Sequence, residues 1–273
     1  MKFIIYNPKT HLFDFFIDAL SYTLNTYIYD QTYLYDYNND KILFIINPHF
    51  IYDYKDIHNE IINISKLFKF KILYITEPIN FLIEKKVYLD IIKLIKPYRL
   101  WTYTVENFNK LNTYIPIYRV FPKYNEAYNF INNDINTLRN TDNIIFFGNI
   151  TENRINICNE FGNYLINKTD AWSKEEWSDI LKNNLFYLNI HRRINCKSFE
   201  AFRIIPILAN GGVIFSERCN TIEELEYKNY NIIFTERDNL YNTFIKYKEN
   251  IDYDNIFDKT LLFRNALNEK III

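Results

Sequence analysis

The chain has 273 residues, of which 48% are hydrophobic and 18% aromatic, so it is long enough for two domains and apolar enough to fill their cores. Lys and Arg number 32 against 33 Asp and Glu, and the net charge of -1 excludes a chain-wide field that would attract nucleic acid or an anionic membrane. An anionic ligand must therefore be held by a local cluster of donors.

The first half alternates segments typical of strands and helices. Short apolar runs that end at turn residues predict strands, and apolar positions at helical spacing predict helices. Continuously apolar strands favour a parallel sheet covered by helices on both faces, as in a Rossmann-like domain. The predicted strands are residues 2–6, 41–46, 71–75, 99–103 and 115–120, and the predicted helices are residues 12–24, 55–68 and 86–95.

A polar stretch at residues 132–142 predicts a linker, after which the same pattern restarts. We therefore predict an α/β chain of two Rossmann-like domains, residues 1–138 and 139–273, whose parallel sheets face an interdomain cleft. The last helix could pack back on the N-terminal domain. The second domain has predicted strands at 143–147, 185–190, 212–215 and 231–234, and predicted helices at 152–165, 198–209, 222–227, 237–249 and 257–267.

Several classes of protein are disfavoured by missing motifs. The sequence has no GxGxxG after its first strand and no GxxxxGK[ST], so NAD and P-loop ATP sites are not expected. Cys158, Cys196 and Cys219 are widely spaced, fit no zinc pattern and predict reduced thiols. The N-terminus does not resemble a signal peptide, and no run reaches the roughly 18 apolar residues of a membrane helix. We expect a cytoplasmic protein with no transmembrane segment, no metal and no cofactor.

Residues 185–217 carry the most chemical information, as strand, basic loop, helix, Gly-Gly turn and strand. The loop contains His191, Arg193 and Lys197 between a strand end and a helix start, where backbone N–H groups and the helix dipole favour an anion. A diphosphate fits this position, and a solvated basic loop is the alternative.

Glu200 is predicted in the first turn of the helix after this loop, with Arg203 three residues later on the same face. A carboxylate can accept hydrogen bonds from the two hydroxyls of a sugar or ribose diol, and an arginine can bind phosphate. The alternatives are a helix cap for Glu200 and an intrahelical ion pair for both. Pro206 should kink or end this helix, and Gly211-Gly212 then allows a tight turn.

These residues resemble a known family. The runs Asn189-Ile190-His191, Phe199 to Ile204 and Gly211 to Glu217 look like the donor site of GT-B glycosyltransferases, in particular the CgeB-like group found in bacteria and large viruses. Phe147-Gly148 is similar to the opening turn of that group's second domain, and residues 101–107 are similar to a segment near the end of its first domain. The resemblance covers the C-terminal half well and the N-terminal half weakly.

The resemblance implies a glycosyltransferase that uses a nucleotide-diphosphate sugar, such as a UDP- or GDP-sugar, without a metal. Glu200 would hold a diol of the donor, and Arg203 and the 191–197 loop its phosphates. Ser216 and Glu217 would border the sugar, and Gly148 would lie at the donor site. A viral origin would place the protein in the host cytoplasm.

The acceptor, a glycan or a protein, is expected on the first domain. His11, His49 and Glu77 follow predicted strands there and are candidates for the general base that an inverting reaction needs. Two alternatives stay open: a sugar-nucleotide epimerase on the same architecture, and a binding module without catalysis. Nucleic acid is not an expected partner, because charge is balanced and aromatic residues are not concentrated with Lys and Arg.

Overall fold

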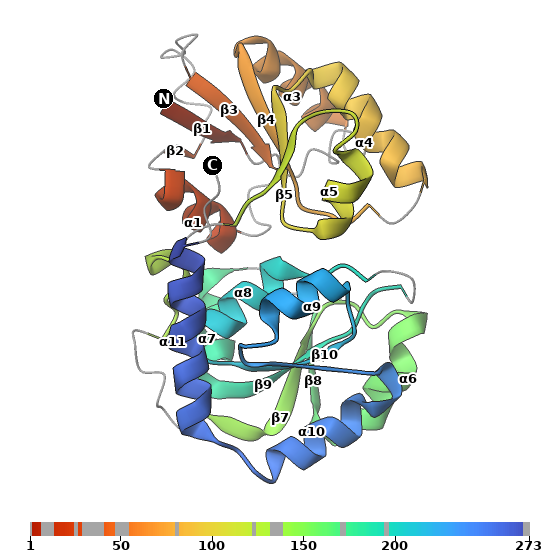
Figure 1. The fold of residues 1–273 in the computed structure, drawn as a ribbon, viewed down its shortest axis with the longest axis vertical. Coiled ribbons are helices and arrows are strands. Elements are labelled where there is room, and N and C mark those ends of the chain that lie inside the picture. The colour runs from red at the N-terminus through yellow and green to blue at the C-terminus, as the bar shows by residue number, and fades with distance from the viewer. Residues whose placement is uncertain are drawn as a thin grey trace. The chain divides into compact units, whose positions relative to one another are not determined.

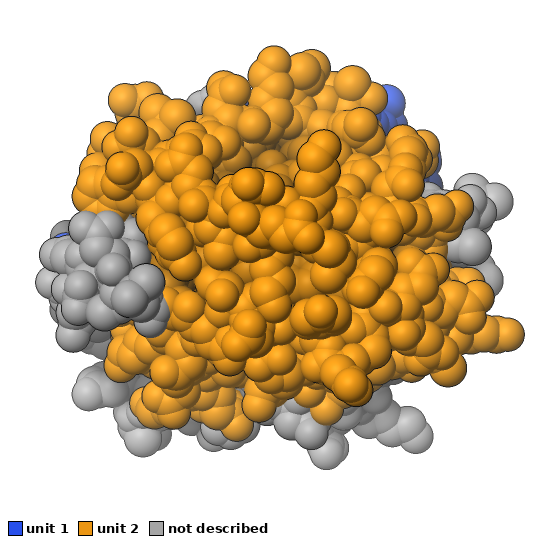
Figure 2. Space-filling model, turned by 90° about the horizontal axis from the view of Figure 1, so that it is seen from below, with its two compact units in different colours: residues 1–12, 16–123, 270–273 blue, residues 13–15, 124–269 orange. Residues whose placement is uncertain are grey.

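A computed structural model describes residues 2–6, 14–24, 27–28, 41–46, 55–79, 82–121, 124–131, 139–169, 173–193 and 197–269. Its contacts divide the chain into two compact units, coloured separately in Figure 2. Unit 1 is Met1–Leu12, Phe16–Lys123 and Lys270–Ile273, and unit 2 is Phe13–Phe15 and Tyr124–Glu269. The domain boundary after residue 138 stays a prediction.

Unit 1 is built on a parallel six-stranded sheet in the order β2-β1-β3-β4-β5-β6 (Figure 1). All five predicted strands are present, whereas β2 and α5 carried no recognised signal in the sequence. Its core is formed by aliphatic side chains, including Leu43, Ile45, Leu73 and Ile91. The strands are β1 Lys2–Tyr6, β2 Tyr27–Ile28, β3 Lys41–Ile46, β4 Phe70–Ile75, β5 Arg99–Thr102 and β6 Ile117–Arg119, and the helices are α1 Asp14–Leu24, α3 Lys55–Lys66, α4 Leu82–Ile95 and α5 Val105–Leu111.

Unit 2 holds a parallel five-stranded sheet in the order β11-β10-β9-β7-β8. Its core is rich in phenylalanine: Phe186, Phe215 and Phe244 form edge-to-face pairs with ring centroids 5.5–5.8 Å apart. The strands are β7 Asn140–Phe147, β8 Leu165–Lys168, β9 Asn184–Asn189, β10 Val213–Glu217 and β11 Ile232–Thr235. The helices are α6 Glu152–Phe161, α7 Lys174–Asn183, α8 Ala201–Ala209, α9 Thr221–Tyr227, α10 Leu240–Lys248 and α11 Tyr253–Glu269.

The predicted helix over 152–165 is wrong at its end. Gly162 follows Phe161 with a φ of 50°, which stops α6, and after a single 3-10 turn the chain continues as strand β8 from Leu165. Helix α7 was also missed, although Ser173 and Glu176 form a capping box at its start. The polar residues 140–142, predicted as linker, are the beginning of β7.

Helix α8 begins at Ala201 rather than Ser198 and ends at Ala209 as predicted, and Pro206 lies inside it without ending it. Most of its side chains are buried, so tertiary packing outweighs the hydrogen bond that Pro206 cannot make. The Asn210 side chain also donates to the Pro206 carbonyl oxygen over 2.7 Å, which satisfies a carbonyl at the helix end.

The last helix, α11, packs within unit 2. The Arg264 Nε donates to the Ala209 carbonyl at the end of α8 over 2.7 Å, and the Asn231 side chain donates to the Ile256 carbonyl over 2.8 Å. No helix among the described residues is both long and apolar enough to cross a membrane.

The turn between α8 and β10 requires glycine at position 212. A Cβ there would lie 2.5 Å from Ile207 Cγ2 and 2.7 Å from Tyr187 Cε2, closer than van der Waals contact allows. Tyr187 is a fully buried residue of the central strand β9, so neither neighbour can move away cheaply.

We expect Gly212→Ala to lower the free energy of unfolding by about 3 kcal/mol, because overpacking displaces buried side chains. Gly162→Ala is the control: it makes the same substitution where nothing lies within 4 Å of the new Cβ, and its own positive φ of 50° should cost about 1 kcal/mol. Urea unfolding of both variants measures the difference. Equal losses would show that packing at Gly212 is not the constraint.

Candidate functional site

The carboxyl ends of three neighbouring strands of unit 2 gather charged side chains. β7, β9 and β10 lie side by side and parallel, so their carboxyl ends share one edge of the sheet. Helix α6 begins just after β7, and α8 begins after the loop that follows β9. Both helix N-termini therefore lie at this edge, and their unpaired N–H groups make it favourable for anions.

Arg154 lies at the centre of this edge and is only 3% exposed. Its Nε and Nη2 donate to the Ile190 carbonyl oxygen over 3.0 and 2.6 Å, and its Nη1 donates to the Asn149 carbonyl over 3.0 Å. The guanidinium also lies 5.0 Å above the Phe146 ring. Burial lowers the pKa of Arg154, and the nearby Glu200 carboxylate opposes that shift. Arg154 thus fixes the end of β9 to the loop after β7.

Glu200 accepts contacts from two arginines. Its Oε1 lies 3.7 Å from Arg154 Nη2, and its Oε2 pairs with Arg203 Nη1. Glu200 is the residue that precedes α8, but its side chain makes no capping hydrogen bond, so the alternative of a simple helix cap is excluded. Burial by itself would raise the pKa of the Glu200 carboxyl, but Arg203, Arg154, His191 and Arg192 together hold it below the ordinary value.

Gly148 provides the room that this cluster needs. Its φ is 132°, a conformation that residues with a Cβ rarely adopt, and a Cβ there would lie 3.3 Å from Arg203 Nη1 and 3.6 Å from Arg154 Nη1. Gly148, Arg154, Glu200 and Arg203 are therefore one packed group, here named the arginine-glutamate cluster. The predicted ion pair between Glu200 and Arg203 is part of it.

A second group of contacts joins the ends of β9, β10 and β11. The His191 backbone N–H donates to Glu217 Oε2 over 2.5 Å, and Glu217 Oε1 pairs with Arg237 Nη1 over 2.9 Å. His191 Nε2 lies 2.9 Å from the Arg218 carbonyl oxygen, while its Nδ1 is buried and has no hydrogen-bond partner within the described part of the chain. Ser216 is fully buried, and its hydroxyl donates to the Glu217 carbonyl over 2.9 Å.

The structure thus brings most of the predicted donor-site residues to one sheet edge. Gly148, Glu200 and Arg203 form one group, and His191, Ser216 and Glu217 belong to the other. Ser216 and Glu217 are the last residues of β10 itself and do not follow it. The roles of all six residues toward a ligand stay predictions.

The remaining predicted residues are not part of the two groups of contacts described above. Arg193 is half-buried, and Lys197 is exposed, with its carbonyl accepting from the Asn220 N–H over 2.7 Å. Glu77 is exposed just after β4, and its carbonyl accepts from the Asn107 side chain over 3.0 Å. His11 and His49 lie outside the described residues.

Sequence reasoning missed Arg154 and Arg237. Arg154 is the third residue of α6, where a cation opposes the helix dipole, and Arg203 has the same position in α8. An arginine in the first turn of a helix that follows a parallel strand is unfavourable locally, and that conflict was a usable signal. Arg237 pairs with a residue of a neighbouring strand, which no sequence spacing reveals.

Comparisons with known proteins bear on the fold. No protein-family model matches the chain, and a search of curated proteins gives no match. WaaG, a glycosyltransferase involved in lipopolysaccharide biosynthesis, is similar with a TM-score of 0.54 and 7% identity over 99% of this chain and 95% of that chain. HepE of Anabaena, in complex with UDP, gives a TM-score of 0.47 and 9% identity over 99% and 98% of the two chains.

A third structure, OtsA in its apo form, gives a TM-score of 0.43 and 10% identity over 85% of this chain and 70% of that chain. The likeness to WaaG shows the fold: the chain has the two parallel α/β sheets of a GT-B glycosyltransferase. The predicted α/β fold with two parallel sheets is therefore confirmed.

The Glu200 carboxylate should stabilise the fold in a pH-dependent way. Its folded-state pKa is lowered, so its contribution is fully present above the unfolded value near 4.3 and is lost as pH falls through the folded pKa. We expect Glu200→Gln to lower the free energy of unfolding at pH 7 by about 1–3 kcal/mol, since it leaves buried Arg154 without its carboxylate.

Unfolding curves of wild type and Glu200→Gln from pH 7 down to pH 3 measure this effect. The difference in the free energy of unfolding between the two proteins should become smaller as the pH falls. Glu175→Gln, an exposed carboxylate in the first turn of α7, is the control and should give a small, nearly constant gap. A gap for Glu200→Gln that does not depend on pH would contradict the assignment.

Proposed function

We propose that this chain is a glycosyltransferase of the CgeB-like group, which takes its sugar from a nucleotide-diphosphate-sugar donor bound by unit 2. The observation that carries the proposal is the arginine-glutamate cluster at the carboxyl edge of β7 and β9. The GT-B fold shared with WaaG supports it, because that protein is a glycosyltransferase.

The charges of the cluster favour an anionic ligand. One carboxylate, Glu200, faces the two guanidinium groups of Arg154 and Arg203, and Arg192 adds a further positive charge close enough to lower the Glu200 pKa. The N-termini of α6 and α8 add partial positive charge at the same edge. The excess is positive, and a diphosphate has the charge and the acceptor oxygens to match it.

The two arginines suit different tasks. Arg154 is buried and already donates to two backbone carbonyls, so its role is to hold the edge together. Arg203 is 27% exposed, and among the described residues its ion pair is with Glu200. A guanidinium has five N–H donors, so Arg203 keeps donors for a phosphate while Glu200 fixes its orientation.

Glu200 retains capacity for hydroxyl groups. A carboxylate has about four acceptor positions, and the two arginines occupy at most one on each oxygen. With 23% of its side chain exposed, Glu200 can accept from two vicinal hydroxyls of the donor, on its sugar or its ribose. His191, Arg193, Lys197, Ser216 and Glu217 complete the proposed donor surface.

The reaction breaks the bond between the anomeric carbon and the diphosphate oxygen, and forms a bond from that carbon to an acceptor hydroxyl oxygen. Negative charge grows on the leaving diphosphate, where Arg203 and the helix N-termini stabilise it, so the proposal requires no metal. The acceptor hydroxyl loses its proton. For an inverting enzyme His11, His49 and Glu77 stay candidates for the base, with a glycan or protein acceptor on unit 1.

A thermal-shift screen of UDP- and GDP-sugars tests the proposal. We expect at least one to raise the melting temperature of the wild type, since a ligand that binds the folded state stabilises it. Arg203→Gln should weaken that binding by roughly 10- to 100-fold, as expected when a charge-assisted contact to phosphate is lost. Titration of the same ligand by calorimetry measures the change.

The matched control is Arg218→Gln. Arg218 is an exposed arginine of unit 2 whose guanidinium pairs with Glu224 and Glu236 instead of Glu200. The Arg218→Gln variant should bind the ligand with the same affinity as the wild type. The proposal fails if no diphosphate sugar stabilises the wild type, or if both variants lose affinity equally.

A further inference from the structure

One edge of unit 1 combines many cations with exposed apolar side chains. Helices α3 and α4 end there, and strands β4 and β5 begin there, because both connections return to the amino edge of the parallel sheet. Residues 66–71 and 93–99 contain six cations and no Asp or Glu, although the whole chain has a net charge of -1. This surface, named the basic edge, consists of Lys66, Leu67, Lys69, Lys71, Lys93, Leu94, Lys96, Tyr98 and Arg99.

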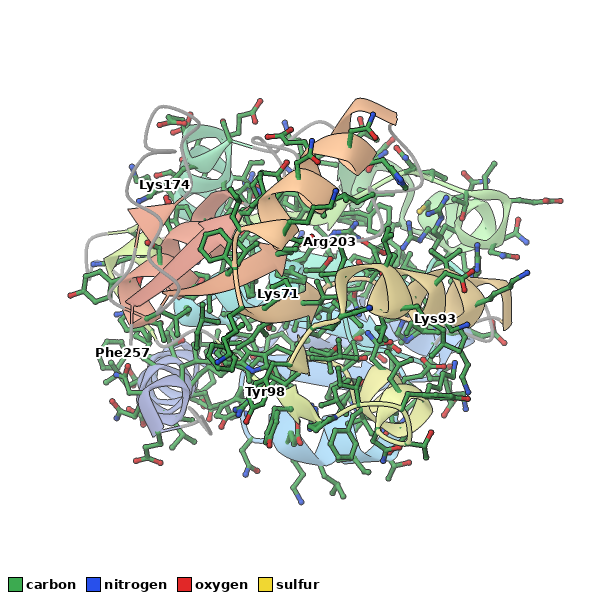
Figure 3. All side chains as sticks on the ribbon, turned by 90° about the horizontal axis from the view of Figure 1, so that it is seen from above. Lys71, Lys93, Tyr98, Lys174, Arg203 and Phe257 are labelled. Atoms are coloured by element: carbon green, nitrogen blue, oxygen red, sulfur yellow. The ribbon has the colours of Figure 1, made fainter. Side chains whose placement is uncertain are left out.

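Contacts join the two turns of the basic edge into one surface. The Tyr98 N–H donates to the Lys71 carbonyl oxygen over 2.8 Å, and the Phe70 and Tyr98 rings pack edge to face with centroids 5.8 Å apart. The Arg99 guanidinium lies 4.6 Å from the Tyr98 ring centroid. Figure 3, seen from above, labels Lys71, Lys93 and Tyr98 of this surface.

The cations of the basic edge are poorly compensated. Among the described residues the one ion pair they form is between Lys93 and Asp90, over 3.7 Å. Burial lowers the pKa of Lys71, and the nearby charge of Lys96 lowers it further. Helix dipoles favour Lys66 and Lys93, which lie in the last turns of α3 and α4, and Lys96, which directly follows α4. The Lys71 Nζ donates to the Phe68 carbonyl oxygen over 3.1 Å. Neither explanation applies to Lys69 and Arg99.

The backbone conformation of Lys96 also indicates that the basic edge has a role beyond folding. This residue follows α4 with a φ of 52°, the left-handed position at a helix end that glycine or asparagine occupies most cheaply. Folding alone would favour one of those residues, and a lysine there adds an exposed charge to the basic edge.

Three large apolar side chains project among these lysines. Leu67 is 46% exposed, Leu94 42% and Tyr98 56%. A lysine-rich surface interrupted by leucines and a tyrosine fits the interface of a bilayer, where ammonium groups meet anionic headgroups and apolar groups enter the acyl boundary. Nucleic acid would use the cations but leaves the two leucines without a partner.

We propose that the basic edge docks unit 1 on an anionic lipid bilayer. The proposal does not depend on the donor site, which lies in unit 2. Within unit 1 the docking edge is separated from the carboxyl ends of its strands by the length of β4, six residues or about 20 Å. Docking therefore leaves the carboxyl edge of the unit 1 sheet away from the headgroups.

Co-sedimentation of the full chain with vesicles tests this proposal. We expect binding to phosphatidylcholine vesicles that contain phosphatidylglycerol, little binding to pure phosphatidylcholine, and weakening by salt. A variant with Lys66→Gln, Lys69→Gln and Lys96→Asn should have a vesicle partition coefficient roughly a hundredfold lower than the wild type, because each lost lysine lowers it about fivefold. Asparagine is chosen at position 96 because it tolerates the left-handed conformation.

The control removes three exposed lysines from unit 2, as Lys174→Gln, Lys182→Gln and Lys228→Gln, and should bind vesicles as the wild type does. Leu67→Ser with Leu94→Ser should weaken binding without changing net charge. Failure of the wild type to bind anionic vesicles overturns the proposal, as do equal losses in both lysine variants or a preference for RNA over vesicles. Stabilisation by a nucleotide sugar should be the same in the basic-edge variant and the wild type, so this test and that of the donor site fail separately.

Discussion

The site depends on one buried charge. Arg154 is a cation with 3% exposure at the start of a helix, where both burial and the helix dipole disfavour it. It is tolerated because the Ile190 and Asn149 carbonyl oxygens accept its hydrogen bonds and because Glu200 lies 3.7 Å away. Glu200 in turn orients Arg203, and Gly148 leaves the space that the Arg203 guanidinium occupies. The position of each member is thus fixed by the others.

The same logic explains why the fold places its chemistry at one edge. In a parallel sheet every strand ends on the same side, so loops that are distant in sequence meet there. Gly148, His191 and Glu217 come from three separate strand ends and still gather within one unit. The balanced charge of the whole chain does not reveal this local concentration of charge. It also does not reveal the six cations of the basic edge, which lie at the amino edge of the unit 1 sheet.

Much of this arrangement was predictable from sequence, and the failures have physical reasons. The apolar runs gave the central strands, because burial on both faces leaves a continuous signal. β8 and α7 were missed because β8 is short and half exposed, and α7 has a polar outer face that resembles a loop. Pro206 does not end α8, because burial of this helix outweighs one lost hydrogen bond. The pairing of Glu200 with Arg203 followed from helical spacing, whereas its contact with Arg154 joins two helices and has no local signature.

The contact between His191 and Arg218 determines what the imidazole can offer. A carbonyl oxygen can only accept, so Nε2, 2.9 Å away, must carry the ring hydrogen of a neutral histidine. That tautomer leaves the lone pair on Nδ1, which is buried and has no hydrogen-bond partner among the described residues. The Arg218 carbonyl thus fixes which nitrogen of a neutral imidazole can accept a hydrogen bond, in a loop where Arg192, Arg193 and Lys197 only donate.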